Sequence, residues 1–332
     1  MELINYKSAK TNLYNKISAI DFNQLAISNY NKEYIGRLKP ALPFFLAIYA
    51  NCLKEGLSRT EKDINEVILV DYGGGSGFLS MLAKEIGVGK VIYIDLNEKS
   101  VEAVELIQNE TGIGPDIILH GESAKLAAWC SENNIKPDLL LATDVIEHIY
   151  DLSVFFKEVI GINNQMDLIF TTASTPYNPH VKNRLHRYMR GCETGKLEKP
   201  NYYTKRVNYI KKAFPKFSRK NVRKWAVLTR GLIYSDIHKA ISQNERPLLL
   251  DAYNTCDPET GNWTERILSM RDYRELVATY HYTVEVKKGF YNTQRPKLWK
   301  KTLSLLANQL IKHSGKVGLV FAPFIFLSFS RK

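Results

Sequence analysis

The stretch that most constrains the fold of this chain is residues 67–80, which read VILVDYGGGSGFLS. A run of apolar residues leads into four glycines, although glycine destabilises both strands and helices. Four glycines in one place indicate a sharp turn in which the backbone approaches a ligand without side chains in the way. We therefore predict a buried strand, a glycine loop and a helix, with the loop at the strand end where open parallel sheets bind ligands.

The rest of the chain alternates short apolar runs with helical stretches. An N-terminal helix is expected at 41–53, where apolar residues recur three and four apart. Helices are also expected near 77–86, 98–109, 123–133, 151–161 and 270–279, and strands at 67–71, 91–95, 116–120, 138–143, 167–172, 282–288 and 322–329. This alternation predicts an α/β fold in which a parallel sheet carries helices on both faces.

The spacing inside the glycine loop distinguishes between kinds of nucleotide site. A P-loop requires Gly-Lys-Ser/Thr, and no lysine follows Gly77. The dinucleotide fingerprint G-x-G-x-x-G, counted from Gly73 and Gly75, would place Phe78 where a small residue is required. The chain instead has D-x-G-x-G-x-G, beginning at Asp71.

This loop resembles motif I of the class I S-adenosylmethionine-dependent methyltransferases. Asp95 ends the second strand, 22 residues after Gly73, where a carboxylate can accept hydrogen bonds from both ribose hydroxyls. NAD-binding folds place an acid similarly, so Asp95 alone does not discriminate. HGES at 120–123 continues the resemblance, TDVIEHIYD at 143–151 is similar to the ubiquinone-biosynthesis-type and small-molecule methyltransferases, and 266–291 resembles the closing helix, strand and turn of that group.

The resemblance covers about residues 65–175 and 264–330. It implies a Rossmann-like class I methyltransferase fold, with a seven-stranded, mostly parallel sheet and helices on both faces. It also implies S-adenosyl-L-methionine as cofactor. The residues that it assigns to the cofactor are Asp71, Gly73, Gly74, Gly75, Gly77, Asp95, Leu96, Glu122, Ser123, Asp144 and Val145.

Positive charge is concentrated in one segment. The net charge is +12, yet residues 181–232 contain 16 lysines or arginines and two acids, so this segment contributes +14 and the remainder −2. The domains expected are a helical N-terminal extension at 1–65, a cofactor-binding core at 66–175, a basic and mainly helical insertion after the fifth strand at 176–263 that serves as an acceptor lid, and a completion of the sheet at 264–332.

A charge of one sign indicates a binding partner, because mixed charges would serve solubility better. Three kinds of partner suit the basic insertion. The first is an anionic acceptor, such as a nucleotide-linked or phosphate-linked sugar. The second is an anionic membrane surface, where each basic residue contributes about 1 kcal/mol. The third is nucleic acid, with the interleaved aromatic residues stacking on bases. The sequence favours them in that order.

The acceptor class is narrowed by motifs that the sequence lacks. Amide and nucleobase-amine methyltransferases carry N-P-P-Y or D-P-P-Y where this chain reads TDVI, and base C5 methylation needs a cysteine there. Metal-dependent enzymes need acids after the fourth and fifth strands, but the fifth ends TTASTP, so we expect no metal. An O-methyltransferase for an anionic small molecule or glycan remains. The alternatives are N-methylation of a small amine and an RNA-binding or RNA-modifying protein.

A hydroxyl acceptor needs a base to remove its proton, and the rest of the task is to hold the reactants in line. The candidate bases are His148, His180 and His186. His148 also has a purely structural alternative, which is to hold the loop beside the cofactor. The residues expected to contact the acceptor are Tyr177, Asn178, Arg184, Arg187, Trp263, Glu265 and Arg266.

Cysteine usage and the chain ends bear on the compartment. The four cysteines are scattered with no CxxC pair, which disfavours a zinc site or a disulfide framework and suits a reducing cytoplasm. The N-terminus has no apolar stretch of signal-peptide length. The apolar run at 317–330, broken by Pro323, is expected to form the last core strand, with contact to the inner face of the membrane as the alternative. The sequence sets no oligomeric state.

Overall fold

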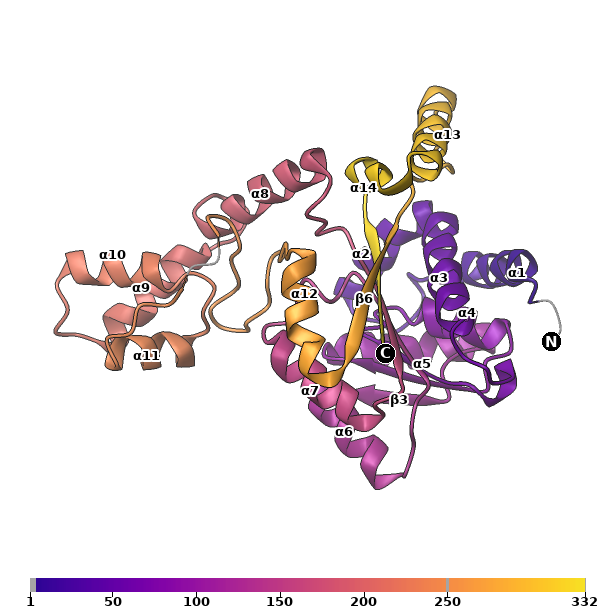
Figure 1. Ribbon diagram of the computed structural model, residues 1–332, viewed down its shortest axis with the longest axis horizontal. Helices are drawn as coiled ribbons and strands as arrows, with labels where there is room; N and C mark the ends of the chain where they lie inside the picture. The colour runs from indigo at the N-terminus through magenta and orange to yellow at the C-terminus, as the bar shows by residue number, and fades with distance from the viewer. Residues whose placement is uncertain (1–3, 249–250, 332) are drawn as a thin grey trace. The chain divides into compact units, whose positions relative to one another are not determined.

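The computed structural model describes residues 4–248 and 251–331 and divides into two compact units (Figure 1). Unit 1 comprises Met1–Val145, Ser153–Thr172 and Met270–Lys332, and unit 2 comprises Ile146–Leu152 and Ala173–Ser269. The basic segment therefore belongs to unit 2, whereas the glycine loop belongs to unit 1. The four segments expected from the sequence remain a prediction.

Unit 1 is built on one sheet of seven strands in the order β3-β2-β1-β4-β5-β7-β6. Strands β1 to β5 are mutually parallel, and β7 is antiparallel to both β5 and β6. The expected seven-stranded, mostly parallel sheet is confirmed. The strands are β1 (Ile68–Tyr72), β2 (Lys90–Asp95), β3 (Ile117–His120), β4 (Leu139–Thr143), β5 (Asp167–Thr172), β6 (Tyr282–Lys288) and β7 (Ile325–Arg331).

Helices follow the strands of this sheet, as the alternating pattern predicts. Apolar side chains on the strands are buried, and four phenylalanines join the sheet to its helices through tilted and edge-on ring contacts: Phe155, Phe156, Phe170 and Phe329. The helices that connect strands are α4 (Phe78–Glu85), α5 (Glu98–Thr111), α6 (Ser123–Glu132), α7 (Leu152–Ile162) and α12 (Met270–Val277).

The N-terminal extension belongs to the same unit as the sheet. It forms α1 (Tyr6–Ala19), α2 (Asn29–Leu38) and α3 (Leu42–Leu57), so the helix expected at 41–53 is present and one turn longer. A Cβ on Gly56 would lie 3.2 Å from Leu139 Cδ1, which places α3 directly on β4. At the end of α3, Glu55 accepts hydrogen bonds from Lys287 Nζ (2.6 Å) and Ser328 Oγ (3.1 Å) on the antiparallel edge of the sheet.

The sequence analysis missed the helix between β6 and β7. Only a strand was expected after residue 288, but α13 (Leu298–His313) and the short α14 (Gly318–Phe321) precede β7. The apolar residues of α13 recur three and four apart, which is the pattern of a helix with one apolar face. None of the helices in the described residues has the length and hydropathy needed to span a membrane.

Unit 2 is helical and has a small core of its own. The core contains Ile210, Val222, Trp225, Ala226, Ile237 and Ile241. Beside it, the Arg206 side chain is fully buried, forms an ion pair with Glu193 and donates to the Ala226 carbonyl at 2.9 Å. The helices are α8 (Pro179–Glu193), α9 (Tyr202–Ala213), α10 (Arg219–Leu228) and α11 (Tyr234–Ser242).

Candidate functional site

The glycine loop joins β1 to α4 and has the conformation that its glycines permit. Gly73, Gly75 and Gly77 all have positive φ, a backbone region that other residues adopt at a cost. At Gly77, where φ is +72°, a Cβ would lie only 2.0 Å from Val104 Cγ2. Gly74 has no such φ, but a Cβ there would lie 2.6 Å from the Tyr93 ring. The loop therefore requires glycine for close approach as well as for its turns.

Asp71 lies beneath this loop rather than on its surface. Its side chain is buried, and Oδ2 accepts hydrogen bonds from the Ser80 amide (3.0 Å) and the Ser80 hydroxyl (2.6 Å). Burial is the main reason that the Asp71 pKa rises from 3.8 to about 7, against the opposing effect of the Ser80 hydrogen bonds. These contacts hold the first turn of α4 against the end of β1, so Asp71 shapes the loop. Direct contact between Asp71 and the cofactor remains a prediction.

The raised pKa of Asp71 predicts a pH dependence of stability. Because the folded-state pKa is above the unfolded value, the contribution is fully present below about pH 4 and is lost as the pH rises toward about 7. The expected slope approaches 1.4 kcal/mol per pH unit, the limit for one proton. Urea unfolding between pH 4 and 8 should show this fall for the wild type and a flatter profile for Asp71→Asn. Parallel profiles would contradict the assignment.

Asp95 connects the end of β2 to the glycine loop. Its Oδ2 accepts from the Gly75 amide at 2.9 Å, and its Oδ1 accepts from the Asn97 amide at 2.8 Å. Desolvation raises the pKa of this half-buried carboxyl, while the two backbone amides act in the opposite direction. Tyr93 Oη donates to the Gly75 carbonyl at 2.7 Å. The carboxylate is thus fixed in orientation at the strand end, with acceptor capacity left for further donors.

Tyr34 on α2 extends the site beyond the residues that the sequence indicated. A Cβ on Gly75 would lie 3.4 Å from the Tyr34 hydroxyl, so this side chain lies against the loop. Burial raises the pKa of Tyr34 to about 12, and the charges of Asp144 and Asp95 act in the same direction. The phenol therefore remains protonated and lies within electrostatic range of both acids.

The stretch after β4 also lies against the glycine loop. A Cβ on Gly73 would lie 2.7 Å from Val145 Cγ2. Asp144 is exposed and has φ +60°, and its amide donates to the Thr171 carbonyl at 2.9 Å. The loop, Asp95, Tyr34, Asp144 and Val145 are therefore brought together in unit 1.

The remaining predicted cofactor residues lie at the ends of β2 and β3. Leu96 is exposed, and its carbonyl lies 3.0 Å from a ring nitrogen of His120. Glu122 is exposed at the start of α6. Ser123 is buried and donates to Glu158 at 2.6 Å, so its hydroxyl proton is used within the protein.

In unit 2, His148 is fixed by the loop that contains Trp263. The Trp263 carbonyl lies 2.7 Å from His148 Nδ1. A carbonyl can only accept, so this contact assigns a proton to Nδ1, and in the neutral imidazole Nε2 is then the nitrogen that can accept one. The Trp263 amide donates back to the His148 carbonyl at 3.3 Å. The geometry suits both a base at Nε2 and the structural role of holding the loop.

Trp263 and Arg266 form an aromatic and cationic surface beside this histidine. The Trp263 ring stacks on Tyr150 at 6.3 Å, and the Arg266 guanidinium lies 4.8 Å from the Trp263 ring centre. Arg266 Nη1 also donates to the Tyr150 carbonyl at 3.2 Å. Glu265 accepts a 2.5 Å hydrogen bond from Ser174. Predicted residues from two distant stretches of sequence therefore meet in one cluster.

The other predicted acceptor residues lie on helix α8 or directly before it. Asn178 caps the helix by accepting from the His180 and Val181 amides, and the Tyr177 amide donates to Thr175 Oγ1. The side chains of His180, Arg184 and Arg187 are exposed. His186 stacks on Tyr253 at 3.7 Å, and burial, followed by the charge of Lys182, lowers its pKa.

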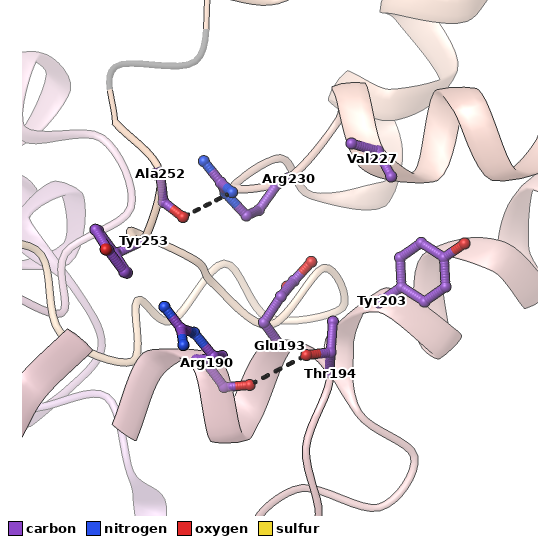
Figure 2. A pocket seen from close by; sticks show the side chains of 8 residues that line it. All are labelled: Arg190, Glu193, Thr194, Tyr203, Val227, Arg230, Ala252 and Tyr253. Atoms are coloured by element: carbon purple, nitrogen blue, oxygen red, sulfur yellow. Dashed lines mark hydrogen bonds between the residues drawn. The ribbon is translucent and has the colours of Figure 1, made fainter. Parts of the chain in front are cut away.

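A pocket of about 470 Å³ lies between α8, α9 and the segment before the Trp263 loop (Figure 2). Arg190 lies over the Tyr253 ring, with 5.7 Å from the guanidinium carbon to the ring centre. Glu193 is paired with Arg206 and accepts from Thr255 Oγ1 at 2.7 Å. The pocket is lined by Arg190, Glu193, Thr194, Tyr203, Val227, Arg230, Ala252 and Tyr253. Because the carboxylate is neutralised by a buried arginine, the remaining charge of the lining is positive.

Comparison with known proteins gives two similar curated sequences. One is the ribosomal protein L11 methyltransferase of Dictyoglomus thermophilum, 26% identical over 147 residues, which is 44% of this chain and 43% of the relative. The other is the enzyme of the same name from Hamiltonella defensa, 23% identical over 108 residues, or 32% and 33% of the two chains. The chain thus spans less than half the length of these relatives. No known protein-family model matches the sequence.

Solved structures give similarities of low sequence identity. One similar structure comes from the complex between the Haloferax volcanii Trm112 methyltransferase activator and a putative methyltransferase. It has a TM-score of 0.44 and 10% identity, and the match covers 92% of this chain and 99% of that one. The YcgJ protein of Bacillus subtilis has a TM-score of 0.42, 12% identity and coverage of 85% and 98%. A methyltransferase from Mesorhizobium loti has a TM-score of 0.40, 12% identity and coverage of 84% and 96%.

The sheet itself decides the fold. An antiparallel β7 inserted between β5 and β6 distinguishes it from the dinucleotide-binding order 3-2-1-4-5-6, and the other strands keep that order. The chain has the class I methyltransferase fold. In this methyltransferase fold the glycine loop occupies the turn after β1, and Asp95 ends the neighbouring strand β2.

Tyr34 is the residue of the site that the sequence analysis did not find. It precedes the methyltransferase core and belongs to no motif quoted for the family. The one available signal was Tyr30 and Tyr34 at a spacing of four, whose rings are parallel and 6.3 Å apart on α2. Within the described part of the chain, no group of three or more His, Cys, Asp or Glu side chains is arranged to hold a metal ion.

Proposed function

We propose that this chain is an S-adenosylmethionine-dependent methyltransferase whose acceptor is an oxygen of an anionic, phosphate-linked small molecule or glycan. The observation that carries the proposal is the Asp95 carboxylate held on the glycine loop by the Gly75 amide, inside a methyltransferase sheet. Two ribose hydroxyls are donors that suit this carboxylate, since its orientation is set before a ligand arrives.

The residues of unit 1 are suited to S-adenosylmethionine in their chemistry. Asp95 would accept from the ribose, the loop backbone at Gly73 and Gly75 would approach the ligand closely, and Tyr34 would cover it with a neutral phenol. When bound, the cofactor supplies an activated methyl group. The protein's part is then to bind and orient, because an in-line displacement depends on alignment.

His148 is the base that we propose for the acceptor hydroxyl. Its Nδ1 proton is used by the Trp263 carbonyl, so Nε2 can take the proton of the hydroxyl. His148 is four residues from Asp144 in the chain.

The pocket of unit 2 is proposed to hold the anionic part of the acceptor. Its lining connects to His148 through residues 254–267, which fold back on themselves: the Thr264 amide donates to the Thr255 carbonyl at 3.0 Å, and Cys256 pairs with Trp263. Gly231, next to Arg230 of the pocket, approaches Trp263 so closely that a Cβ would lie 2.8 Å from its ring. An acceptor with its phosphate near Arg190 and its ring on Trp263 or Tyr253 would fit this arrangement.

A second candidate function is methylation of a ribosomal protein. The two curated relatives are named for ribosomal protein L11. The positive charge of residues 181–232 would then bind ribosomal RNA beside the protein acceptor. This candidate predicts transfer to ribosomal particles and none to phosphorylated sugars.

The cofactor part is tested by calorimetric titration of the full chain with S-adenosylhomocysteine, alongside NADH and a short RNA. Binding of S-adenosylhomocysteine at micromolar concentration, without NADH binding, is the expected result. NADH binding alone would overturn the proposal at its root. Salt-dependent RNA binding with no affinity for S-adenosylhomocysteine would make the protein a nucleic-acid binder that keeps the fold.

The acceptor pocket is tested with Arg190→Ala and inorganic pyrophosphate as the probe. Loss of a charge-assisted hydrogen bond should weaken pyrophosphate binding roughly tenfold. Arg219→Ala is the matched control, since it removes one exposed arginine from the start of α10 in the same unit. An equal loss in both variants would mean that only the overall charge of the unit matters.

A further inference from the structure

One strip of exposed side chains on α13 is apolar and extends from Trp299 to Leu310. Trp299, Leu303, Leu306 and Leu310 recur at spacings of four, three and four, which places them on one helical face. Their exposed fractions are 60%, 56%, 62% and 49%. The buried face is different and is formed by Ser304 and Ile311. In Figure 1 this helix stands away from the sheet. A row of large apolar side chains is therefore presented to whatever surrounds unit 1.

The turn that follows α13 also exposes apolar side chains. Val317 is 61% exposed, and Val320 and Phe321 are each 40% exposed. The helix is held in position by Lys288, whose Nζ donates to the Ile311 carbonyl (2.6 Å) and the Gly315 carbonyl (3.1 Å). Asn308 exchanges two hydrogen bonds with the Tyr291 backbone, at 2.7 and 3.0 Å. The apolar row is thus fixed to the sheet through its C-terminal half.

The charged side chains of residues 286–332 all have the same sign. After Glu285 the chain contains no aspartate or glutamate up to residue 332. The cations that flank the apolar row in the sequence are Arg295, Lys297, Lys300, Lys301, Lys312 and Lys316. The Lys300 ammonium lies 5.4 Å from the Trp299 ring centre. An apolar row with tryptophan at one end and lysines around it has the composition of helices that lie in the headgroup region of anionic membranes.

We propose that α13 and the turn after it, residues 297–321, dock this protein onto an anionic membrane surface. The apolar row enters the boundary between headgroups and acyl chains, and the lysines contact lipid phosphates. A second copy of the chain is the less suitable occupant. Pairing two of these helices would bring lysines together with no acidic residue on either helix to offset them. The proposal is independent of the methyl acceptor.

The test is flotation of the full chain with vesicles of phosphatidylcholine, with and without phosphatidylglycerol. We expect flotation with the anionic vesicles that weakens as salt rises. Leu306→Glu should lower the partition coefficient roughly tenfold or more, because it replaces an inserted leucine with a repelled carboxylate. Gln309→Glu adds the same charge at an exposed position outside the row and should cost much less.

A second measurement follows Trp299 directly. Its emission, taken as the difference between the wild type and Trp299→Phe, should shift to shorter wavelength when anionic vesicles are added. Flotation that is equal with neutral and anionic vesicles, or unchanged in Leu306→Glu, would overturn the proposal. So would absence of flotation together with a dimer that Leu306→Glu dissociates in sedimentation equilibrium, since the row would then belong to a second copy.

Discussion

Asp95→Ala is expected to weaken binding of S-adenosylhomocysteine by a factor of roughly 100 to 10,000. The variant removes a charged acceptor for two donors, and hydrogen bonds to charged groups contribute about 1.5–3 kcal/mol each. It also leaves the Gly75 amide without the acceptor that lies 2.9 Å away in the wild type, so the loop loses part of its preorganisation. Isothermal calorimetry on the full chain measures the loss directly.

The control for Asp95 is Glu98→Ala, which removes an exposed acid from the first turn of α5 three residues later. Its effect should stay within about twofold, because surface charges contribute little. Asp95→Asn adds a sharper comparison, since it keeps the shape and one acceptor oxygen and should fall between the other two variants. Unchanged affinity in Asp95→Ala would remove this residue from the cofactor site and the central support from the proposed function.

The parts of this molecule that could be predicted from the sequence are those encoded by local patterns. A strand buried on both faces must be a short apolar run, and a sharp turn at its end requires glycine. Residues 67–80 therefore identify β1, the loop and α4 without any tertiary information. Asp95 could also be predicted, because the end of the next strand lies beside the first in a parallel sheet.

The parts that could not be predicted depend on contacts between distant residues. Tyr34 reaches the glycine loop only because α2 folds into unit 1 together with that loop, and nothing in its local sequence indicates this packing. Asp71 is buried because it lies in a central strand, and its hydrogen-bond partner Ser80 is nine residues later in the chain. α13 is a different case. Its period of four and three is local, so a helix could have been predicted there, but the sequence analysis assigned no element to the residues between the strands at 282–288 and 322–329.

His148 illustrates the boundary between these two cases. The sequence places a histidine after β4 and leaves open whether it reacts or supports. Its contact with the Trp263 carbonyl joins residues 115 positions apart, so only the fold could reveal which nitrogen holds the proton. If His148 is the base, the nitrogen that reacts is therefore Nε2. The same contact also holds the Trp263 loop, so a variant is needed that separates catalysis from this structural role.

His148→Ala is expected to lower kcat by a factor of roughly 100 to 10,000, the range for loss of a general base. The measurement uses the acceptor selected from a panel of nucleotide-linked and phosphorylated sugars. Affinity for S-adenosylhomocysteine should change little, because the variant leaves Asp95 and the glycine loop intact. The pH–rate profile of the wild type should also contain an ionisation that the variant lacks.

His148→Asn separates the two roles of this residue. Its amide Nδ2 can take the place of Nδ1 and donate to the Trp263 carbonyl, but the side chain has no nitrogen that accepts a proton. If the histidine is the base, the asparagine variant should be as slow as the alanine variant. Its melting temperature should equal that of the wild type, whereas the alanine variant, which lacks the hydrogen bond to the Trp263 carbonyl, should melt at a lower temperature. If asparagine restores kcat, the histidine only holds the Trp263 loop. The base would then have to be sought among the exposed His180 and the stacked His186, whose rings lie on α8.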